Sequence, residues 1–108
     1  MPPGEEQAAT EFYEGVLGIP RMSKPSHLEA RGGCWFESEA VRIHLGVESD
    51  FRPAKKAHPA LIVDDLDSLR ARLTEAGVSA TEDQPLPGFS RFYVSDPFGN
   101  RIEFVSPA

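Results

Sequence analysis

Several features that mark well-known protein classes are missing from this sequence. It contains one cysteine, Cys34, so no disulfide can form within the chain, which is typical of a reducing compartment. No apolar run approaches the length of a transmembrane helix, and the first residues lack a basic-then-apolar signal pattern. Basic residues are in the minority, and a net charge of −6 argues against nucleic acid or an anionic membrane as a partner. We therefore expect a cytoplasmic protein.

Familiar catalytic motifs are absent as well. The chain has no Gly-rich phosphate loop, no nucleophile elbow and no zinc-finger spacing. At 108 residues, 40% hydrophobic and 26% charged, it has the composition of one ordinary globular domain. Its function therefore has to be sought in how its polar residues are placed.

An internal repeat is the most informative feature that is present. Residues 42–45 (RIHL) and 101–104 (RIEF) are nearly the same and lie 59 residues apart. Gly18 and Gly77, which end two predicted amphipathic helices, are also 59 residues apart. An offset that holds from a helix end to a last strand indicates an internal duplication. At one differing position His44 matches Glu103, and both side chains can bind a metal ion.

The two copies predict similar elements. The first copy has the pattern of one helix and three strands, at residues 5–17, 27–31 (the weakest), 34–37 and 41–47. The second has the pattern of a strand, a helix capped by Asp65 and three further strands, at residues 59–63, 66–76, 78–82, 89–95 and 101–105. The first copy thus lacks an opening strand, and we expect the true start upstream of Met1. We predict modules over 1–48 and 58–108, joined by a linker over 49–57 into one domain.

Strand alternation places three potential metal ligands. Residues on either side of His44 and Glu103 are apolar and should face the helices, so His44 and Glu103 should lie on the opposite face. His58 opens the first strand of the second copy. Two imidazoles and one carboxylate suit Fe, Mn, Zn or Ni as a divalent ion with open coordination positions. The alternative is a polar sheet face that is simply solvated.

Other side chains are candidates for binding a small molecule. Trp35 and Phe98 either line an apolar ligand pocket or belong to the core. Arg42 and Arg101 either hold an anionic substrate or form surface ion pairs. Cys34 lies in an apolar strand, which predicts an inert buried thiol.

Two segments resemble those of a known family. Residues 11–19 (EFYEGVLGI) look like the "FY…VLG" first helix of the vicinal oxygen chelate superfamily, which comprises glyoxalase I, the bleomycin-resistance proteins and the extradiol dioxygenases. Residues 92–104 (FYVSDPFGNRIEF) are similar to its closing "DP-G-N-E" hairpin. The resemblance covers nearly the whole chain. It implies an α+β fold in which two βαβββ modules form a cup-shaped pair of half-barrels around a ligand.

The resemblance also implies roles for individual residues. Metal ligands in this superfamily come from the first and last strands of the modules, which gives His44, His58 and Glu103. Glu103 is also the implied catalytic carboxylate, and Tyr93 has the spacing of the tyrosine that precedes the closing glutamate in extradiol dioxygenases. Many members are homodimers, and the unpaired strand edge of the first copy also favours a dimer.

Two functions remain open from the sequence. The first is a metal-dependent lyase, isomerase or dioxygenase whose ion chelates vicinal oxygens of a small substrate. The alternative is a metal-free protein that binds a small molecule by aromatic stacking and charge, as bleomycin-resistance proteins do. His44 stands where glyoxalase I has a glutamate, and residues 78–82 contain no histidine to act as the second base of a dioxygenase. The chain thus resembles the superfamily better than any one branch, and the missing strand leaves open a fragment that depends on a partner.

Overall fold

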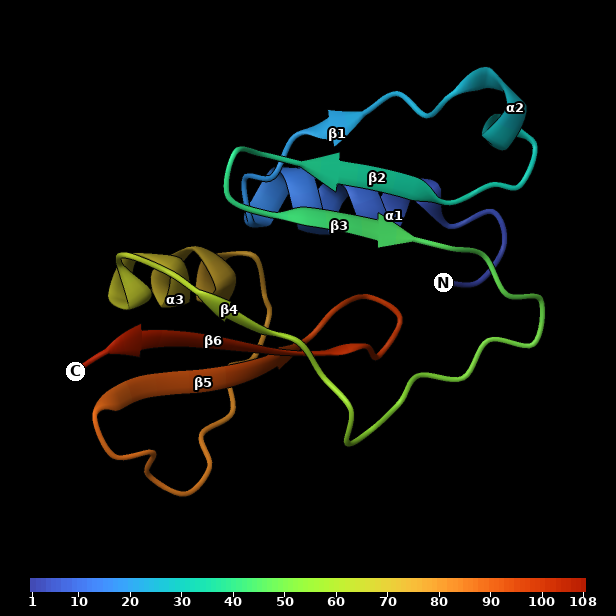
Figure 1. Cartoon of the computed structure of the whole chain (residues 1–108). Helices are drawn as coiled ribbons and strands as arrows, with labels where there is room; N and C mark the ends of the chain where they lie inside the picture. The colour runs from blue at the N-terminus through green and yellow to red at the C-terminus, as the bar shows by residue number, and fades with distance from the viewer. The chain divides into compact units, whose positions relative to one another are not determined.

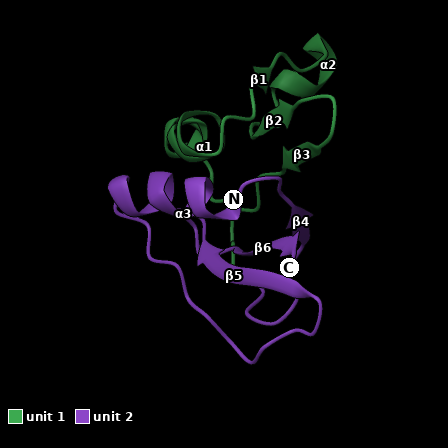
Figure 2. Ribbon diagram, turned by 90° about the vertical axis from the view of Figure 1, so that its left-hand side faces the viewer, with its two compact units in different colours: residues 1–52 green, residues 53–108 purple.

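The computed structural model describes all 108 residues, which form two compact units, residues 1–52 and 53–108 (Figures 1 and 2). Each unit contains one three-stranded sheet and its own helices, so the predicted α+β class is confirmed. The boundary between the units falls inside the predicted linker, residues 49–57. Across the chain, no helix has both the length and the apolar character needed to cross a bilayer.

The first unit begins with a continuous helical segment. α1 (Glu6–Thr10) runs directly into η1 (Glu11–Val16), which is a π-helix and therefore has wider turns than α1. Phe12 and Tyr13 are buried, and the Tyr13 ring stacks on Phe36 of the sheet with 5.2 Å between ring centroids. The predicted helix is therefore present, although the apolar spacing gave no sign of the π turns.

The sheet of the first unit is antiparallel, in the order β1 (Arg21–Met22), β2 (Cys34–Glu37), β3 (Arg42–Leu45). The predicted hairpin of β2 and β3 is confirmed. The weak strand predicted at residues 27–31 is wrong, because the short helix α2 (Ser26–Glu29) lies there. The Pro25 carbonyl accepts a hydrogen bond from the Leu28 N–H at 2.9 Å, so the chain turns as soon as it leaves Pro25. β1 pairs with β2 instead.

The second unit contains β4 (Ala60–Ile62), α3 (Leu66–Glu75), β5 (Phe89–Ser95) and β6 (Arg101–Pro107). The sheet order is β4-β6-β5, with β4 parallel and β5 antiparallel to the central β6. The predicted cap of α3 is confirmed, because the Asp65 carboxylate accepts the Ser68 N–H at 3.0 Å. The strand predicted at residues 78–82 is reduced to one bridge, between Thr81 and Tyr93.

One face of the second sheet is apolar and packs on α3. Its buried side chains are those of Phe92, Ile102 and Phe104, and α3 contributes Leu69 and Leu73. Strand alternation sends the next residues along β5 and β6 to the other face. That non-helical face carries the polar residues that the sequence singled out in the second unit.

The strand pairings support the duplication. Met22 pairs with Trp35 in the first unit, and Thr81 pairs with Tyr93 in the second. Directly across the next strand, Trp35 lies opposite His44, and Tyr93 lies opposite Glu103. The two sheets thus place an aromatic ring beside a potential metal ligand at equivalent positions.

Gly33 provides a test of how the first unit is held together. It adopts a φ of +84°, and a Cβ there would lie 2.1 Å from the Leu45 carbonyl oxygen on β3. Gly77, at +80°, has open space around the same position. We expect Gly77→Ala to cost about 1 kcal/mol, for the backbone conformation alone. Gly33→Ala should cost at least about 2 kcal/mol more, because the start of the β2–β3 pair must move. Urea unfolding of both variants measures the difference, and equal losses would contradict the close approach.

Candidate functional site

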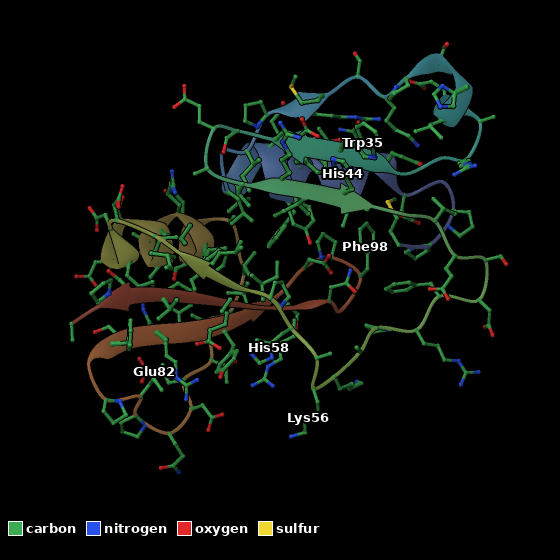
Figure 3. All side chains as sticks on the ribbon, in the orientation of Figure 1. Trp35, His44, Lys56, His58, Glu82 and Phe98 are labelled. Carbon is green, nitrogen blue, oxygen red and sulfur yellow. The ribbon has the colours of Figure 1, made fainter.

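The non-helical face of the second sheet carries a cluster of titratable side chains. We call it the face cluster: His58, Arg91, Tyr93, Arg101 and Glu103. His58 lies on the segment that leads into β4 (Figure 3), Arg91 and Tyr93 on β5, and Arg101 and Glu103 on β6. Because these strands are hydrogen-bonded neighbours, residues from distant parts of the chain meet on one surface.

His58 and Glu103 form the centre of the face cluster. His58 Nε2 lies 2.9 Å from Glu103 Oε1, and His58 Nδ1 lies 2.8 Å from the Lys56 carbonyl oxygen. Only 22% of the His58 side chain and 8% of the Glu103 side chain are exposed. Both ring nitrogens of His58 therefore face an oxygen atom, one of a side-chain carboxylate and one of a backbone carbonyl. The structure thus brings together two of the three predicted metal ligands.

Arg91 holds the opposite side of the Glu103 carboxylate. Its Nη1 donates to the Tyr93 hydroxyl at 2.7 Å and lies 3.5 Å from Glu103 Oε2. Burial by itself would raise the pKa of Glu103, but the hydrogen bonds from His58 and Arg91 and their positive charges outweigh it, so the pKa is lowered. Glu103 is therefore a carboxylate at neutral pH.

Arg91 also has an unused donor. Its Nη2 donates to the Gln84 carbonyl at 2.8 Å, whereas Nε is buried and has no hydrogen-bond partner. Sequence reasoning did not identify Arg91. Arg91 lies two residues before Tyr93 in β5, and residues two apart in a strand share one face. Strand alternation could therefore have placed Arg91 beside Tyr93 and Glu103.

Tyr93 and Arg101 complete the face cluster. The Arg101 guanidinium lies over the Tyr93 ring, 3.9 Å from the ring centroid. The His58 ring meets Tyr93 edge to face, with 5.2 Å between centroids. Arg101 therefore does not form the surface ion pair that was one of its predicted alternatives, but packs on the aromatic ring beside Glu103.

His44 has a different carboxylate partner in the first unit. His44 Nε2 lies 2.6 Å from Glu37 Oε2, and the His44 ring stacks on Trp35 with 4.0 Å between centroids and 4° between planes (Figure 3). Arg42 is 4.0 Å from the other Glu37 oxygen, and its side chain is 77% exposed. Nowhere in the structure do three or more His, Cys, Asp or Glu side chains form a group suited to hold a metal ion. A shared ion at His44, His58 and Glu103 remains a prediction.

Phe98, the last predicted substrate contact, lies in the turn between β5 and β6. The Asp96 carboxylate accepts the N–H groups of Phe98 and Asn100, each at 2.9 Å, and therefore holds this turn closed. A contact between Phe98 and a substrate remains a prediction.

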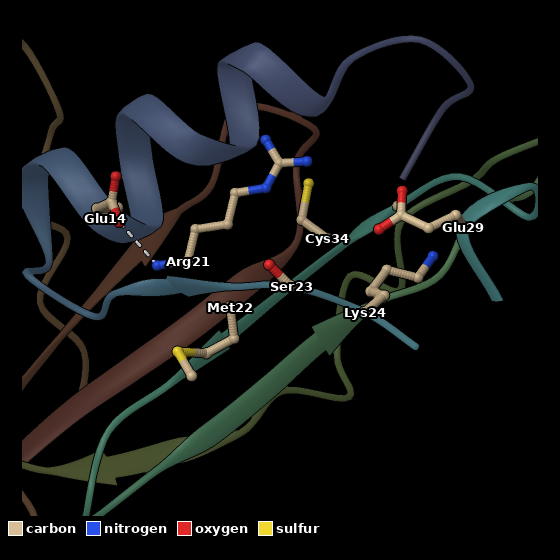
Figure 4. Close-up of a pocket in the computed structure, with 8 residues that line it drawn as sticks. Glu14, Arg21, Met22, Ser23, Lys24, Glu29 and Cys34 are labelled. Carbon is tan, nitrogen blue, oxygen red and sulfur yellow. Dashed lines mark hydrogen bonds between the residues drawn. The ribbon is translucent and has the colours of Figure 1, made fainter. Parts of the chain in front are cut away.

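Cavities open on the surface of the first unit. One, of about 270 Å³, is lined on one side by the stacked Trp35 and His44 and on another by Lys24 and Arg31. Another, of about 380 Å³, lies beside Arg21 and Cys34, where the Glu14 carboxylate accepts the Arg21 N–H at 2.7 Å (Figure 4). Burial raises the pKa of the Cys34 thiol, so it is a poor nucleophile at neutral pH, in agreement with the inert thiol that was predicted.

Comparisons with known proteins give a family and several similar structures. The family model "Glyoxalase/Bleomycin resistance protein/Dioxygenase superfamily" matches residues 3–104. A search of curated protein sequences gave no match. A glyoxalase family protein from Bacillus anthracis is 45% identical with a TM-score of 0.95, over 100% of this chain and 88% of that chain.

Two more distant structures share the fold. TnmS3, an antibiotic-binding protein from Streptomyces sp. CB03234, is 25% identical with a TM-score of 0.74, over 100% of this chain and 91% of that chain. A glyoxalase/dioxygenase from Nostoc punctiforme is 18% identical with a TM-score of 0.77, over 100% of this chain and 87% of that chain.

Replacing Glu103 with Gln tests the electrostatics of the face cluster. A carboxyl whose pKa is lowered by folding stabilises the fold above its unfolded-state pKa, and this stabilisation is lost as the pH falls through the folded-state pKa. At pH 7 we expect Glu103→Gln to unfold with about 1–3 kcal/mol less free energy than the wild type. Below about pH 4 the difference should shrink, because the wild-type carboxyl becomes neutral too.

Urea unfolding at pH 7 and at acid pH measures this effect. The matched control is Glu82→Gln, since the Glu82 side chain is 72% exposed and pairs with Arg70 at the surface. That substitution should change the stability by less than about 0.5 kcal/mol at either pH. A loss at Glu103 that does not depend on pH would show that shape, not charge, sets its contribution.

Proposed function

This chain belongs to the glyoxalase/bleomycin resistance protein/dioxygenase superfamily, and on that premise we propose that it binds a small oxygen-rich molecule at a divalent metal ion on the non-helical face of its second sheet. His58 and Glu103 would hold the ion. The observation that carries this proposal is the position of His58 Nε2 beside Glu103 Oε1, with His58 Nδ1 directed to the Lys56 carbonyl.

The donor geometry supports a metal ion. Nitrogen and oxygen ligands about 2.0–2.2 Å from one ion, at right angles to each other, are about 3 Å apart. His58 Nε2 and Glu103 Oε1 are 2.9 Å apart, so an ion could lie within bonding distance of both, beside the line that joins them, once the imidazole and the carboxylate turn their lone pairs toward it. A backbone carbonyl at the other ring nitrogen is the usual way in which a metal-binding histidine is oriented.

Two protein ligands leave several coordination positions open. We assign them to substrate oxygens; His44, the third ligand that the sequence predicts, is bonded to the Glu37 carboxylate within the first unit. When bound, a divalent ion supplies Lewis-acid stabilisation of negative charge on a chelated oxygen.

The remaining residues of the face cluster bind and orient the substrate. The Arg91 guanidinium lies beside the Glu103 carboxylate and the Arg101 guanidinium lies over the Tyr93 ring, so two cations on one face attract an anion. The buried Nε of Arg91 has no protein partner, so a substrate oxygen could accept its hydrogen only if the guanidinium turned toward the surface. Because Arg91 donates to the Tyr93 oxygen, the hydroxyl hydrogen of Tyr93 remains available to a developing oxyanion.

A second candidate function is metal-free binding of a planar ligand in the first unit. The observation that favours it is the 270 Å³ cavity, where the stacked rings of Trp35 and His44 meet the cationic side chains of Lys24 and Arg31. An aromatic anion suits such a cavity by stacking and charge. The similarity to TnmS3, named as an antibiotic-binding protein, is in keeping with this candidate.

Metal titration tests the first proposal. Protein stripped with EDTA should bind Mn²⁺ or Zn²⁺ in calorimetry with one ion per chain, and His58→Gln or Glu103→Gln should each weaken binding at least about tenfold. Because protons and metal ions compete for the same imidazole nitrogen, binding should strengthen as the pH rises.

The titration has its own controls. His27→Gln removes an exposed histidine from α2 and should leave the affinity unchanged. His44→Gln reports whether the first unit supplies a ligand. If neither ion binds, or if the His58 and Glu103 variants bind like the wild type, the metal proposal is wrong.

Fluorescence tests the second candidate, because Trp35 is the only tryptophan in the chain. We expect 2-naphthoate, a planar aromatic anion, to quench Trp35 emission equally with and without EDTA. Arg31→Gln and Lys24→Gln should weaken this quenching about threefold or more, because each removes one cation from the cavity wall. Arg52→Gln serves as the control, since Arg52 does not line the cavity. Quenching that requires a metal ion, or that is the same in the wild type, Arg31→Gln and Lys24→Gln, would exclude this binding mode.

A further inference from the structure

The non-helical face of the second sheet continues beyond the face cluster as an apolar surface. The strand register arranges this face in rows. Tyr93, Glu103 and Ala60 form one row across the three strands, and the next row contains Val105 and Ile62 beside Arg91. The row after that pairs Phe89 with Pro107. Successive rows lie about 7 Å apart, because two residues of a strand span that distance.

The apolar rows are unusually open to solvent. On the side of the sheet that packs on α3, Phe92, Val94, Ile102 and Phe104 are each at most 3% exposed, whereas on the other side Ile62 is 77% exposed and Phe89 is 45% exposed. Val105 lies on the central strand β6, is only 8% exposed, and forms the base of the apolar surface that Ile62 and Phe89 flank. We call Ile62, Phe89, Val105 and Pro107 the apolar row pair. Burying such side chains under a ligand is favourable in proportion to the apolar area removed from water.

We infer that the apolar row pair is a specificity subsite that binds an alkyl or aryl arm of the substrate. The inference rests on the proposed function, because the oxygens of the same molecule would be held by the face cluster. Its ligand class is therefore an amphipathic 2-hydroxy acid or a similar vicinal-oxygen compound, with the apolar arm attached next to the oxygens.

Continuity of the surface argues for this occupant. Arg91 belongs to both regions: its guanidinium contacts Tyr93 and Glu103, and its Cα pairs with Val105 in the row of Ile62. A ligand whose oxygens reach Glu103 therefore has its next atoms over Val105, within one row of Ile62. An arm of six to eight carbons extends about 7–10 Å, so it covers the row of Val105 and Ile62, and its end approaches the row of Phe89, which lies two rows or about 14 Å from Glu103.

A pair of homologous acids separates the arm from the oxygens. Glycolate and 2-hydroxyoctanoate share the same carboxylate and hydroxyl and differ by six carbons. Each fully buried methylene strengthens binding by up to about fourfold, and on this open surface we expect 2-hydroxyoctanoate to bind roughly 10- to 100-fold tighter than glycolate. Calorimetry with the Mn²⁺-loaded chain and with the EDTA-treated chain measures both affinities.

Two substitutions test where the arm binds. Ile62→Ser and Phe89→Ser should each reduce the preference for the longer acid at least about threefold while leaving glycolate affinity unchanged. The matched control is Met22→Ser, which removes an exposed apolar side chain of β1 in the first unit (46% exposed) and should leave the preference intact. Methyl NMR adds a direct readout: of the four isoleucines, Ile62 should shift with 2-hydroxyoctanoate and stay in place with glycolate.

The outcomes distinguish this inference from the proposed function. If both acids bind through Glu103 and Arg91 but the preference survives in both serine variants, the subsite is wrong and the proposed function stands. If neither acid binds, the proposed function fails and the subsite fails with it. A change of molecular mass in sedimentation for Ile62→Ser would instead assign the apolar row pair to a contact between copies of the chain, and would also overturn the subsite.

Discussion

The buried charge of Glu103 is the constraint on which the second unit depends. A carboxylate with 8% of its side chain exposed is costly unless cations and hydrogen bonds compensate it. His58 and Arg91 provide this compensation, from positions 45 and 12 residues away along the chain. They can do so only because β4 and β5 flank β6 in the sheet. The strand order therefore both packs the sheet and brings His58 and Arg91 to the Glu103 charge.

Asp96 is a second buried carboxylate of the same unit. It is 5% exposed, and its carboxylate accepts hydrogen bonds from the Phe98 and Asn100 N–H groups and from the Asn100 side chain, which close the turn between β5 and β6. Glu103 is bonded instead to the side chains of His58 and Arg91, which lie on other strands or lead into them. Its neighbours Ile102 and Phe104 supply the packing of β6, so the Glu103 side chain adds charge to this strand and not apolar packing.

Strand alternation, helix caps and helix-ending glycines predicted most of the fold, because each of these patterns depends only on residues that are close in sequence. Alternation placed His44 and Glu103 on the non-helical faces, and the Asp65 cap and Gly77 bounded α3. The errors came where a local pattern is weak. Pro25 turned an expected strand into α2, and the apolar stripe of the first helix does not distinguish α from π turns.

The site was predicted only in part. The sequence and the family resemblance identified His58, Tyr93, Arg101 and Glu103, but not the groups that these side chains contact. The Arg91 contact with Glu103 depends on the register of β5 against β6, and the Lys56 carbonyl at His58 depends on the local path of the chain before β4; periodicity encodes neither.

The two units use one pairing scheme for different chemistry. In each sheet an aromatic ring lies directly across from the potential metal ligand: Trp35 opposite His44, and Tyr93 opposite Glu103. In the first unit the ring stacks flat on the imidazole, which has a single carboxylate partner and a 43% exposed side chain. In the second, the ring is held between His58 and the Arg101 guanidinium beside a buried carboxylate. The same register thus places a half-exposed, stacked imidazole in one sheet and a buried, ion-paired carboxylate in the other, so one pairing scheme creates two different chemical environments.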